Sequence, residues 1–161
     1  VSDKSDIIVC MDDDDYYQDC YISHIVSKLS SSKKQIAGCS GAFMYQYEFN
    51  QLYKFKSFGP NHSTNNCLAY TSNYLKSHRY QSGLHFAEET SFTNGFSEPM
   101  VQLNPNKCIV ISSHGTNTVD KKHFCTNVKQ NKSIRESNLN IYSLMRKEIF
   151  VRLNKVFESN K

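Results

Sequence analysis

The feature that most constrains the fold is an apolar run that ends in four consecutive aspartates. The run DIIVCM, residues 6–11, has the continuous apolar pattern of a strand covered on both faces. Aspartates 12–15 follow at its carboxyl end, which is where α/β proteins usually place ligand sites. Four adjacent like charges also suit a solvated surface loop, so the acidic run by itself leaves two interpretations open.

Apolar spacing in the first third of the chain predicts a helix and a second strand. Residues 18–30 have the period of an amphipathic helix, which Asp15 or Asp19 could cap. Residues 35–47 indicate one strand, interrupted at its two glycines, where a kink or a close backbone approach is expected. Residues 55–66 are the least regular stretch and are predicted to form a functional or a flexible loop.

The remaining segments continue the alternation of strands and helices. Residues 67–78 predict a short strand that leads into a short helix capped by Thr71 or Ser72, and a further helix begins near Glu88. Two more strands flank an Asn-Pro turn, and helical spacing over residues 137–159 predicts a C-terminal helix that docks on the core. We therefore expect one α/β domain.

Composition excludes several classes of function. The chain has 161 residues, a net charge of +4 and scattered basic residues, so it lacks the footprint of a nucleic-acid-binding protein. No stretch is long and apolar enough to span a membrane, and we expect a cytoplasmic protein. None of the six cysteines forms a CxxC pair, and those in apolar runs are expected to be reduced core thiols, although six could also form disulfides.

Acidic and imidazole side chains follow the predicted strands in an order that suits metal chemistry. In extended geometry Asp12 and Asp14 point the same way and make a hard-oxygen site for Mg²⁺ or Mn²⁺, while Asp13 and Asp15 point away or cap the next helix. The pair Glu88 and Glu89 is either a set of helix-start charges or contains a general base. His114, in a polar loop after a strand, is either structural or a ligand for an ion such as Mn²⁺.

Taken in order, these motifs resemble the GT-A glycosyltransferases, most closely the family 2-like inverting type. The segment CMDDDDYY is similar to the DxD metal motif, FAEETSF to the segment that carries the catalytic base, and SSHGTNT to the segment with the C-terminal metal histidine. The stretch AEETSF…EPMVQLNP…SHGTNT also resembles putative glycosyltransferases of giant viruses. The family's mixed, Rossmann-like sheet is then expected, with the host cytoplasm as the location if the protein is viral.

The resemblance implies a role for each motif. Asp12, Asp14 and His114 would hold Mn²⁺ or Mg²⁺ and, with Asp13, face a nucleotide-diphosphate sugar, with a UDP-sugar favoured. Glu89, with Glu88 beside it, would deprotonate the hydroxyl of a glycan or protein acceptor, and the transfer would invert the anomeric carbon. Residues 1–128 would form the C-terminal half of the GT-A domain, which needs its upstream half, and residues 129–161 a helical extension.

Two other functions fit part of the pattern. A phosphohydrolase of the haloacid dehalogenase type also has Asp-x-Asp after a buried strand, and Asp12 would then be the nucleophile and Asp14 the acid/base. That family expects Thr or Val where this chain has Tyr16, and it needs a lysine for which Lys107 is the candidate. A non-catalytic GT-A remnant or binding module is the third hypothesis.

Overall fold

A computed structural model describes residues 6–83, 87–117, 121–126, 128 and 132–158. Three sequence expectations therefore fall partly outside the described residues. They are the start of the motif HFAEETSF, the end of SSHGTNT and the domain boundary expected after residue 128.

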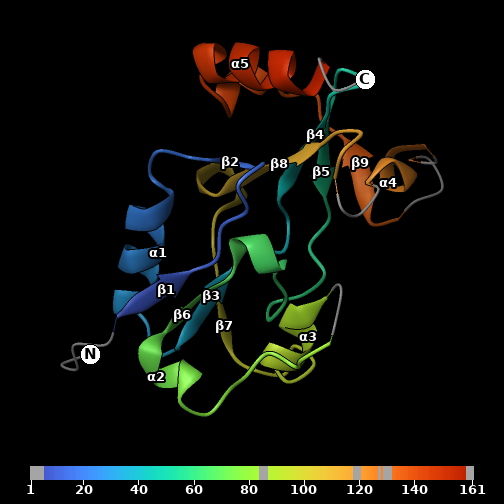
Figure 1. The fold of residues 1–161 in the computed structure, drawn as a ribbon. Coiled ribbons are helices and arrows are strands. Elements are labelled where there is room, and N and C mark those ends of the chain that lie inside the picture. The colour runs from blue at the N-terminus through green and yellow to red at the C-terminus, as the bar shows by residue number, and fades with distance from the viewer. Residues whose placement is uncertain (1–5, 84–86, 118–120, 127, 129–131, 159–161) are drawn as a thin grey trace.

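The first sheet has four strands in the order β1-β6-β3-β7 (Figure 1). Their bounds are β1 Ile7–Val9, β6 Ala69–Thr71, β3 Ile36–Gly38 and β7 Met100–Gln102. β1 and β3 run antiparallel to β6, and β7 runs parallel to β3. Among the described residues β1 pairs only with β6, so it lies at the edge of this sheet. Its residues are half-buried, and the prediction of a strand covered on both faces is therefore wrong.

The second sheet has five strands in the order β2-β8-β4-β5-β9. Their bounds are β2 Tyr16–Tyr17, β8 Ile109–Ser113, β4 Phe43–Gln46, β5 Gln51–Phe55 and β9 Ile134–Glu136. β4 and β8 run parallel to each other, and the other neighbours are antiparallel. Both sheets are therefore mixed, and the chain has the α/β class that the alternating sequence pattern predicts.

The described chain passes between the two sheets five times, and two of these connections run side by side in the same direction. Residues 39–42 join β3 to β4, and residues 103–108 join β7 to β8. The single strand expected over residues 35–47 is thus two strands in different sheets, because the backbone changes direction at the interruption marked by the glycines. At Gly38 the approach is close enough that a Cβ would overlap the Ser63 side chain, which agrees with the expectation of close backbone contact.

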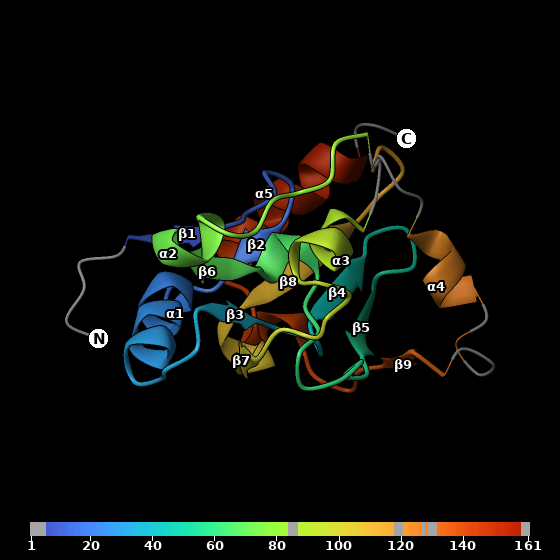
Figure 2. The same ribbon diagram turned by 90° about the horizontal axis from the view of Figure 1, so that it is seen from below.

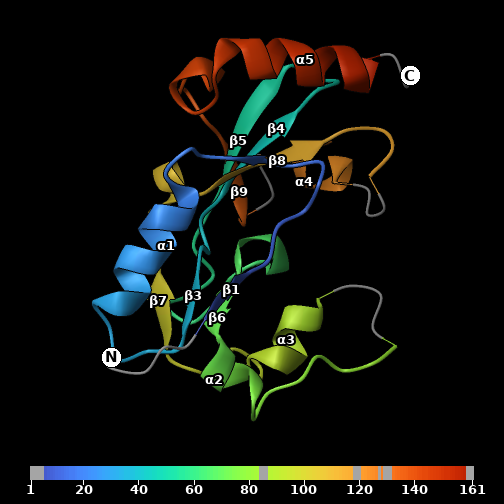
Figure 3. The same cartoon turned by 60° about the vertical axis from the view of Figure 1, so that its left-hand side comes forward.

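Five α-helices surround the sheets within the described ranges (Figures 1 and 2). They are α1 Tyr21–Ser30, α2 Ser72–Leu75, α3 Glu88–Phe92, α4 Lys122–Thr126 and α5 Lys147–Glu158. Short 3₁₀ turns are η1 Asn65–Cys67, η2 Pro105–Lys107 and η3 Ile141–Ser143. Figure 3 shows α5 at one end of the molecule and α2 and α3 at the other.

The helices bury their apolar faces in three clusters. Tyr21, Ile25 and Leu29 of α1 pack where the two sheets meet, and this cluster includes four buried cysteines. Phe150 and Phe157 of α5 cover the opposite face of the second sheet. A third cluster lies under α2 and α3. Side chains alternate along β4 between the first and second clusters, as the two-residue period of a strand requires.

The caps and the C-terminal segment differ in part from the sequence expectations. Thr71 caps α2 as predicted, since its side chain accepts a hydrogen bond from the Tyr74 N–H. The residue before α1 is Cys20, which makes no side-chain cap bond, so the caps proposed at Asp15 and Asp19 are wrong. The segment after residue 128 contains the predicted helix α5 but also β9, which adds to the edge of the second sheet. Among the described helices none is long and apolar enough to cross a membrane.

Candidate metal centre and adjoining pocket

The four aspartates form a turn rather than an extended continuation of β1. β1 ends at Val9, and the turn that follows is closed by Tyr17. The Asp12 N–H donates to the Tyr17 hydroxyl at 2.8 Å, and that hydroxyl donates to the Asn66 carbonyl oxygen at 2.9 Å. Aspartate favours turns because its short side chain competes for backbone hydrogen bonds. The expected strand-like alternation of the aspartates is therefore wrong.

The turn nevertheless gathers three carboxylates. One oxygen from each of Asp12, Asp14 and Asp15 lies within 4.8 Å of the other two. Asp13 is exposed and is not part of this group. Asp12 and Asp14 thus converge as the sequence suggested, through a turn, and Asp15 joins them although it was expected to point away.

Asp15 is held by two donors from distant segments. Its carboxylate accepts the Ser112 N–H at 2.7 Å and the Asn66 side-chain N–H at 2.6 Å. Burial raises the pKa of Asp15 to about 6, because the charged form loses its hydration, and the Asp14 charge adds to the effect. Burial likewise raises the pKa of Asp12, with Asp14 as the next contribution in the same direction. A bound cation would relieve this repulsion.

His114 lies against the acidic group, as the resemblance suggested. Its Nε2 is 3.3 Å from an Asp14 carboxylate oxygen, and Asn117 donates to the same oxygen at 2.9 Å. The His114 N–H donates to the Asn117 side-chain oxygen at 2.8 Å, so the loop that carries both residues is closed on itself. Burial lowers the pKa of His114, which favours the neutral imidazole that a metal ion requires.

The C-terminal helix supports this histidine. The Phe157 ring stacks on the His114 ring with centroids 3.9 Å apart and planes at 11°. Phe157 also packs edge-on against Tyr47 at 4.7 Å. Helix α5 therefore restrains the orientation of His114, although the sequence motif that includes His114 ends about thirty residues earlier.

A pocket of about 310 Å³ adjoins the acidic group. Its lining includes Glu89, Lys121 and Asn66, the residue that also donates to Asp15. Lys121 donates to the Ser112 carbonyl oxygen at 3.0 Å, and its charge lowers the pKa values of both Asp12 and Asp15 against the effect of burial. Asn66 thus contacts both the pocket and Asp15, and the Lys121 charge acts on Asp12 and Asp15 from the pocket wall. We therefore consider the pocket and the carboxylates together as one candidate site.

The pocket wall combines apolar area with unsatisfied polar atoms. Phe55 and Phe58 contribute apolar surface. Three buried side-chain atoms of the wall lack a hydrogen-bond partner among the described residues, namely His62 Nδ1, Thr64 Oγ1 and Asn66 Oδ1. Buried polar atoms are usually paired, so these three have unused hydrogen-bonding capacity just behind the pocket surface. The pocket wall thus has a mixed apolar and polar character.

The acidic pair opens α3 beside the pocket. Glu88 and Glu89 form its first turn, after Ala87 in a left-handed conformation with φ of 56° that is uncommon for a residue with a side chain. Glu89 lines the pocket, and burial raises its pKa, with the Glu88 charge adding to the shift. A raised pKa makes a carboxylate a better proton acceptor. Glu88 is not a lining residue, but its charge acts on Asp12.

Sequence reasoning missed several members of the site. Asp15 is a member of the carboxylate cluster, and Asn66, Asn117 and Lys121 hold or neutralise its carboxylates, yet none of the four was assigned such a role. Asn117 could have been noticed, because it lies three residues after His114 in the same polar loop. Lys107, the lysine considered for a phosphohydrolase, acts on His24 instead.

The chain matches no protein-family model, and no curated protein or solved structure is significantly similar to it. The function proposed below is therefore inferred from the chemistry of the site.

Proposed function

We propose that the protein is a metal-dependent glycosyltransferase of the GT-A type that uses a nucleotide-diphosphate sugar. The observation that carries the proposal is the arrangement of the carboxylates of Asp12, Asp14 and Asp15 with His114, next to a pocket that contains Glu89. Carboxylate oxygens and one imidazole form a donor set suited to Mn²⁺ or Mg²⁺. When bound, such a cation neutralises the charge that develops on a departing diphosphate.

The residues of the chain would divide the remaining work. Asn117 and Phe157 orient Asp14 and His114, and Lys121 adds positive charge where the donor phosphates would lie. Glu89 accepts the proton of an acceptor hydroxyl held in the pocket, and its raised pKa suits that task. Attack by that hydroxyl on the face opposite the diphosphate would invert the anomeric carbon.

Calorimetric titration of UDP into the protein, with and without Mn²⁺, tests the metal half of the proposal. We expect binding that requires Mn²⁺ and that weakens at least about 100-fold in Asp14→Ala, since this substitution removes a first ligand. Asp13→Ala is the matched control, because Asp13 is exposed and lies outside the cluster. Mn²⁺-independent binding, or equal losses in the two variants, would contradict the proposed metal centre.

Glu89→Gln tests the catalytic half separately. This isosteric change should reduce the release of UDP from UDP-sugars, in the presence of acceptor, by about 100-fold or more while leaving Mn²⁺–UDP binding unchanged. Glu88→Gln is the comparison, with a smaller loss expected because Glu88 does not line the pocket. Hydrolysis of p-nitrophenyl phosphate without any sugar would instead support the phosphohydrolase alternative. Metal-dependent UDP binding without any transfer would support the binding module.

A further inference from the structure

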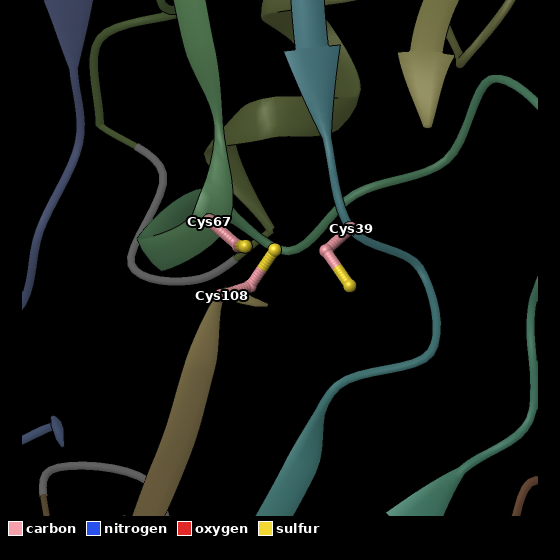
Figure 4. A group of neighbouring side chains, drawn as sticks. All are labelled: Cys39, Cys67 and Cys108. Carbon is pink, nitrogen blue, oxygen red and sulfur yellow. The ribbon is translucent and has the colours of Figure 1, made fainter. Parts of the chain in front are cut away.

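Three cysteine thiols meet in the core where the two sheets join. Cys39 follows β3, Cys67 ends η1 just before β6, and Cys108 directly precedes β8 (Figure 4). Their sulfur atoms all lie within 4.8 Å of one another, and each side chain is at most 1% exposed. All three are free thiols. The proposed glycosyl transfer uses none of them.

We propose that Cys39, Cys67 and Cys108 form a buried binding site for one thiophilic metal ion, Zn²⁺ or Cu⁺. Three thiolates without a carboxylate among them match the soft ligand set that these ions prefer. Three sulfurs at about 2.3 Å from one ion lie about 4 Å apart. The sulfur atoms, which lie within 4.8 Å of one another, can therefore reach this spacing by small side-chain movements without a change in the fold.

The closeness of the three thiols affects their ionisation. The neighbouring Cys108 and Cys67 thiols lower the pKa of Cys39, whereas the neighbouring Cys39 and Cys67 raise the pKa of Cys108. The first thiolate thus forms readily and the later ones do not, so a metal ion must compensate the charge of a fully deprotonated cluster. Binding of Zn²⁺ to three thiols releases three protons and leaves one net negative charge.

Neighbouring residues support such a site. The Tyr21 hydroxyl donates to the Cys67 sulfur at 3.8 Å and can continue to do so when that sulfur binds a metal. The positive charge of Lys54 favours the thiolate form of Cys39. The Cys108 thiol donates to the Asn104 carbonyl oxygen at 3.1 Å, and that proton is one of those released.

Location gives the site a structural role. Cys39 and Cys108 lie on the two neighbouring connections that lead from the first sheet to the second, β3 to β4 and β7 to β8. Cys67 lies at the end of η1, just before β6 of the first sheet. One ion would therefore link three segments that are distant in the sequence. Because the unfolded chain has no preformed site, the binding free energy would stabilise the fold.

The test is a titration of the reduced, metal-free protein with Cd²⁺ as a probe, under anaerobic conditions and with excess Mg²⁺ present to occupy the carboxylates. We expect an ultraviolet thiolate-to-cadmium charge-transfer band that saturates at one equivalent, with release of about three protons per ion. Zn²⁺ and Cu⁺ are then tested separately as competitors, and the tighter one identifies the ion. Displacement by either ion supports the site.

Variants assign the band to the three cysteines. Cys39→Ala should weaken Cd²⁺ binding at least about 100-fold, whereas Cys20→Ser, at an exposed cysteine, should leave it unchanged. Asp14→Ala should also leave the band unchanged, which separates this site from the proposed carboxylate centre. Circular dichroism checks that each variant folds, and the wild-type titration decides the question if Cys39→Ala does not. No band at one equivalent, or a band retained in folded Cys39→Ala, would overturn the proposal.

Discussion

The acidic cluster and the thiol cluster are built in opposite ways. Asp12, Asp14 and Asp15 come from one turn, are exposed or half-buried, and offer hard oxygen atoms. The three cysteines come from three segments, are fully buried, and offer soft sulfur atoms. A local, solvent-accessible group suits an ion that enters with substrate, whereas a buried group suits an ion that stays. If both proposed ions bind, one fold holds an exchangeable site and a structural site apart from each other.

The largest effect is expected at Gly38, which precedes Cys39 of the thiol cluster and lies in close contact with Ser63. In Gly38→Ala the new Cβ would overlap the Ser63 side chain and lie 2.8 Å from the Met100 sulfur. Ser63 is fully buried, and its hydroxyl accepts the Cys39 N–H at 3.1 Å, so the overlap also displaces Cys39. We expect the free energy of unfolding to fall by about 3 kcal/mol, measured by urea denaturation.

Gly41→Ala is the matched control for that change. At Gly41 the nearest atom to a new Cβ would be the Phe55 carbonyl oxygen at 3.6 Å, an ordinary van der Waals contact. Its stability should stay within about 0.5 kcal/mol of the wild type. Equal stabilities of the two variants would show that the region around the thiols is not close-packed, and the contrast with the open acidic turn would then be lost.

The next prediction tests whether the acidic cluster depends on the distant helix α5 or only on its own turn and the loop that carries His114. Phe157 stacks on His114, so Phe157→Ala should remove core packing and loosen the histidine. We expect a loss of about 2 kcal/mol in the free energy of unfolding, because Phe157 lies near the end of α5, and a roughly tenfold weaker Mn²⁺-dependent binding of UDP. Both quantities come from denaturation and calorimetry on the same preparation.

Val151→Ala, at an exposed position of the same helix, is the control. It should change neither the free energy of unfolding nor the Mn²⁺-dependent binding of UDP by much. If Phe157→Ala lowered stability but left the binding constant intact, His114 would be held by its own loop. The acidic cluster would then be fully local, and the contrast with the thiol cluster would be sharper than we infer.

The two clusters also differ in how far the sequence predicts them. The aspartates are contiguous, Glu88 and Glu89 are adjacent, and His114 follows an apolar strand, so local patterns identify them. The carboxylates converge by a turn, and that geometry depends on Tyr17 reaching the backbone of Asp12 and Asn66. Contacts of this kind link residues about fifty positions apart, and no local pattern encodes them.

The thiol cluster is harder still to foresee. Two of its members lie in apolar runs that predict only burial, and Cys67 follows an irregular loop. Their meeting depends on the neighbouring connections at residues 39–42 and 103–108, each of which leads from the first sheet to the second. The sequence suggested a single strand over residues 35–47, interrupted at its glycines, and this interpretation hides the connection at residues 39–42. Six of the described strands lie in stretches that the sequence assigned to strands, whereas β2, β5 and β9 were not predicted. The partition of strands between the two sheets was not predictable either, because it is decided by long-range pairing.

The smallest effect concerns the acidic cluster in the absence of metal. Burial raises the pKa of Asp15 from 3.8 to about 6, so between these values the folded protein binds more protons than the unfolded chain. The stabilisation that comes from protonation of Asp15 is therefore complete below the pKa of the unfolded chain and is lost as the pH rises through about 6. Between about pH 5 and about pH 7.5 the free energy of unfolding should fall by about 1 kcal/mol because Asp15 loses its proton. The matched variant is Asp15→Asn, which cannot titrate, and the quantity to compare is the change in unfolding free energy between the two pH values. Subtracting the change measured for the variant removes the contributions of His114 and Glu89, which titrate in both proteins.

An identical pH dependence in the two proteins would mean that Asp15 is hydrated like an ordinary surface carboxylate. A smaller loss in the wild type when Mn²⁺ is added would show that the cation replaces the proton, as expected if Asp15 belongs to the exchangeable site.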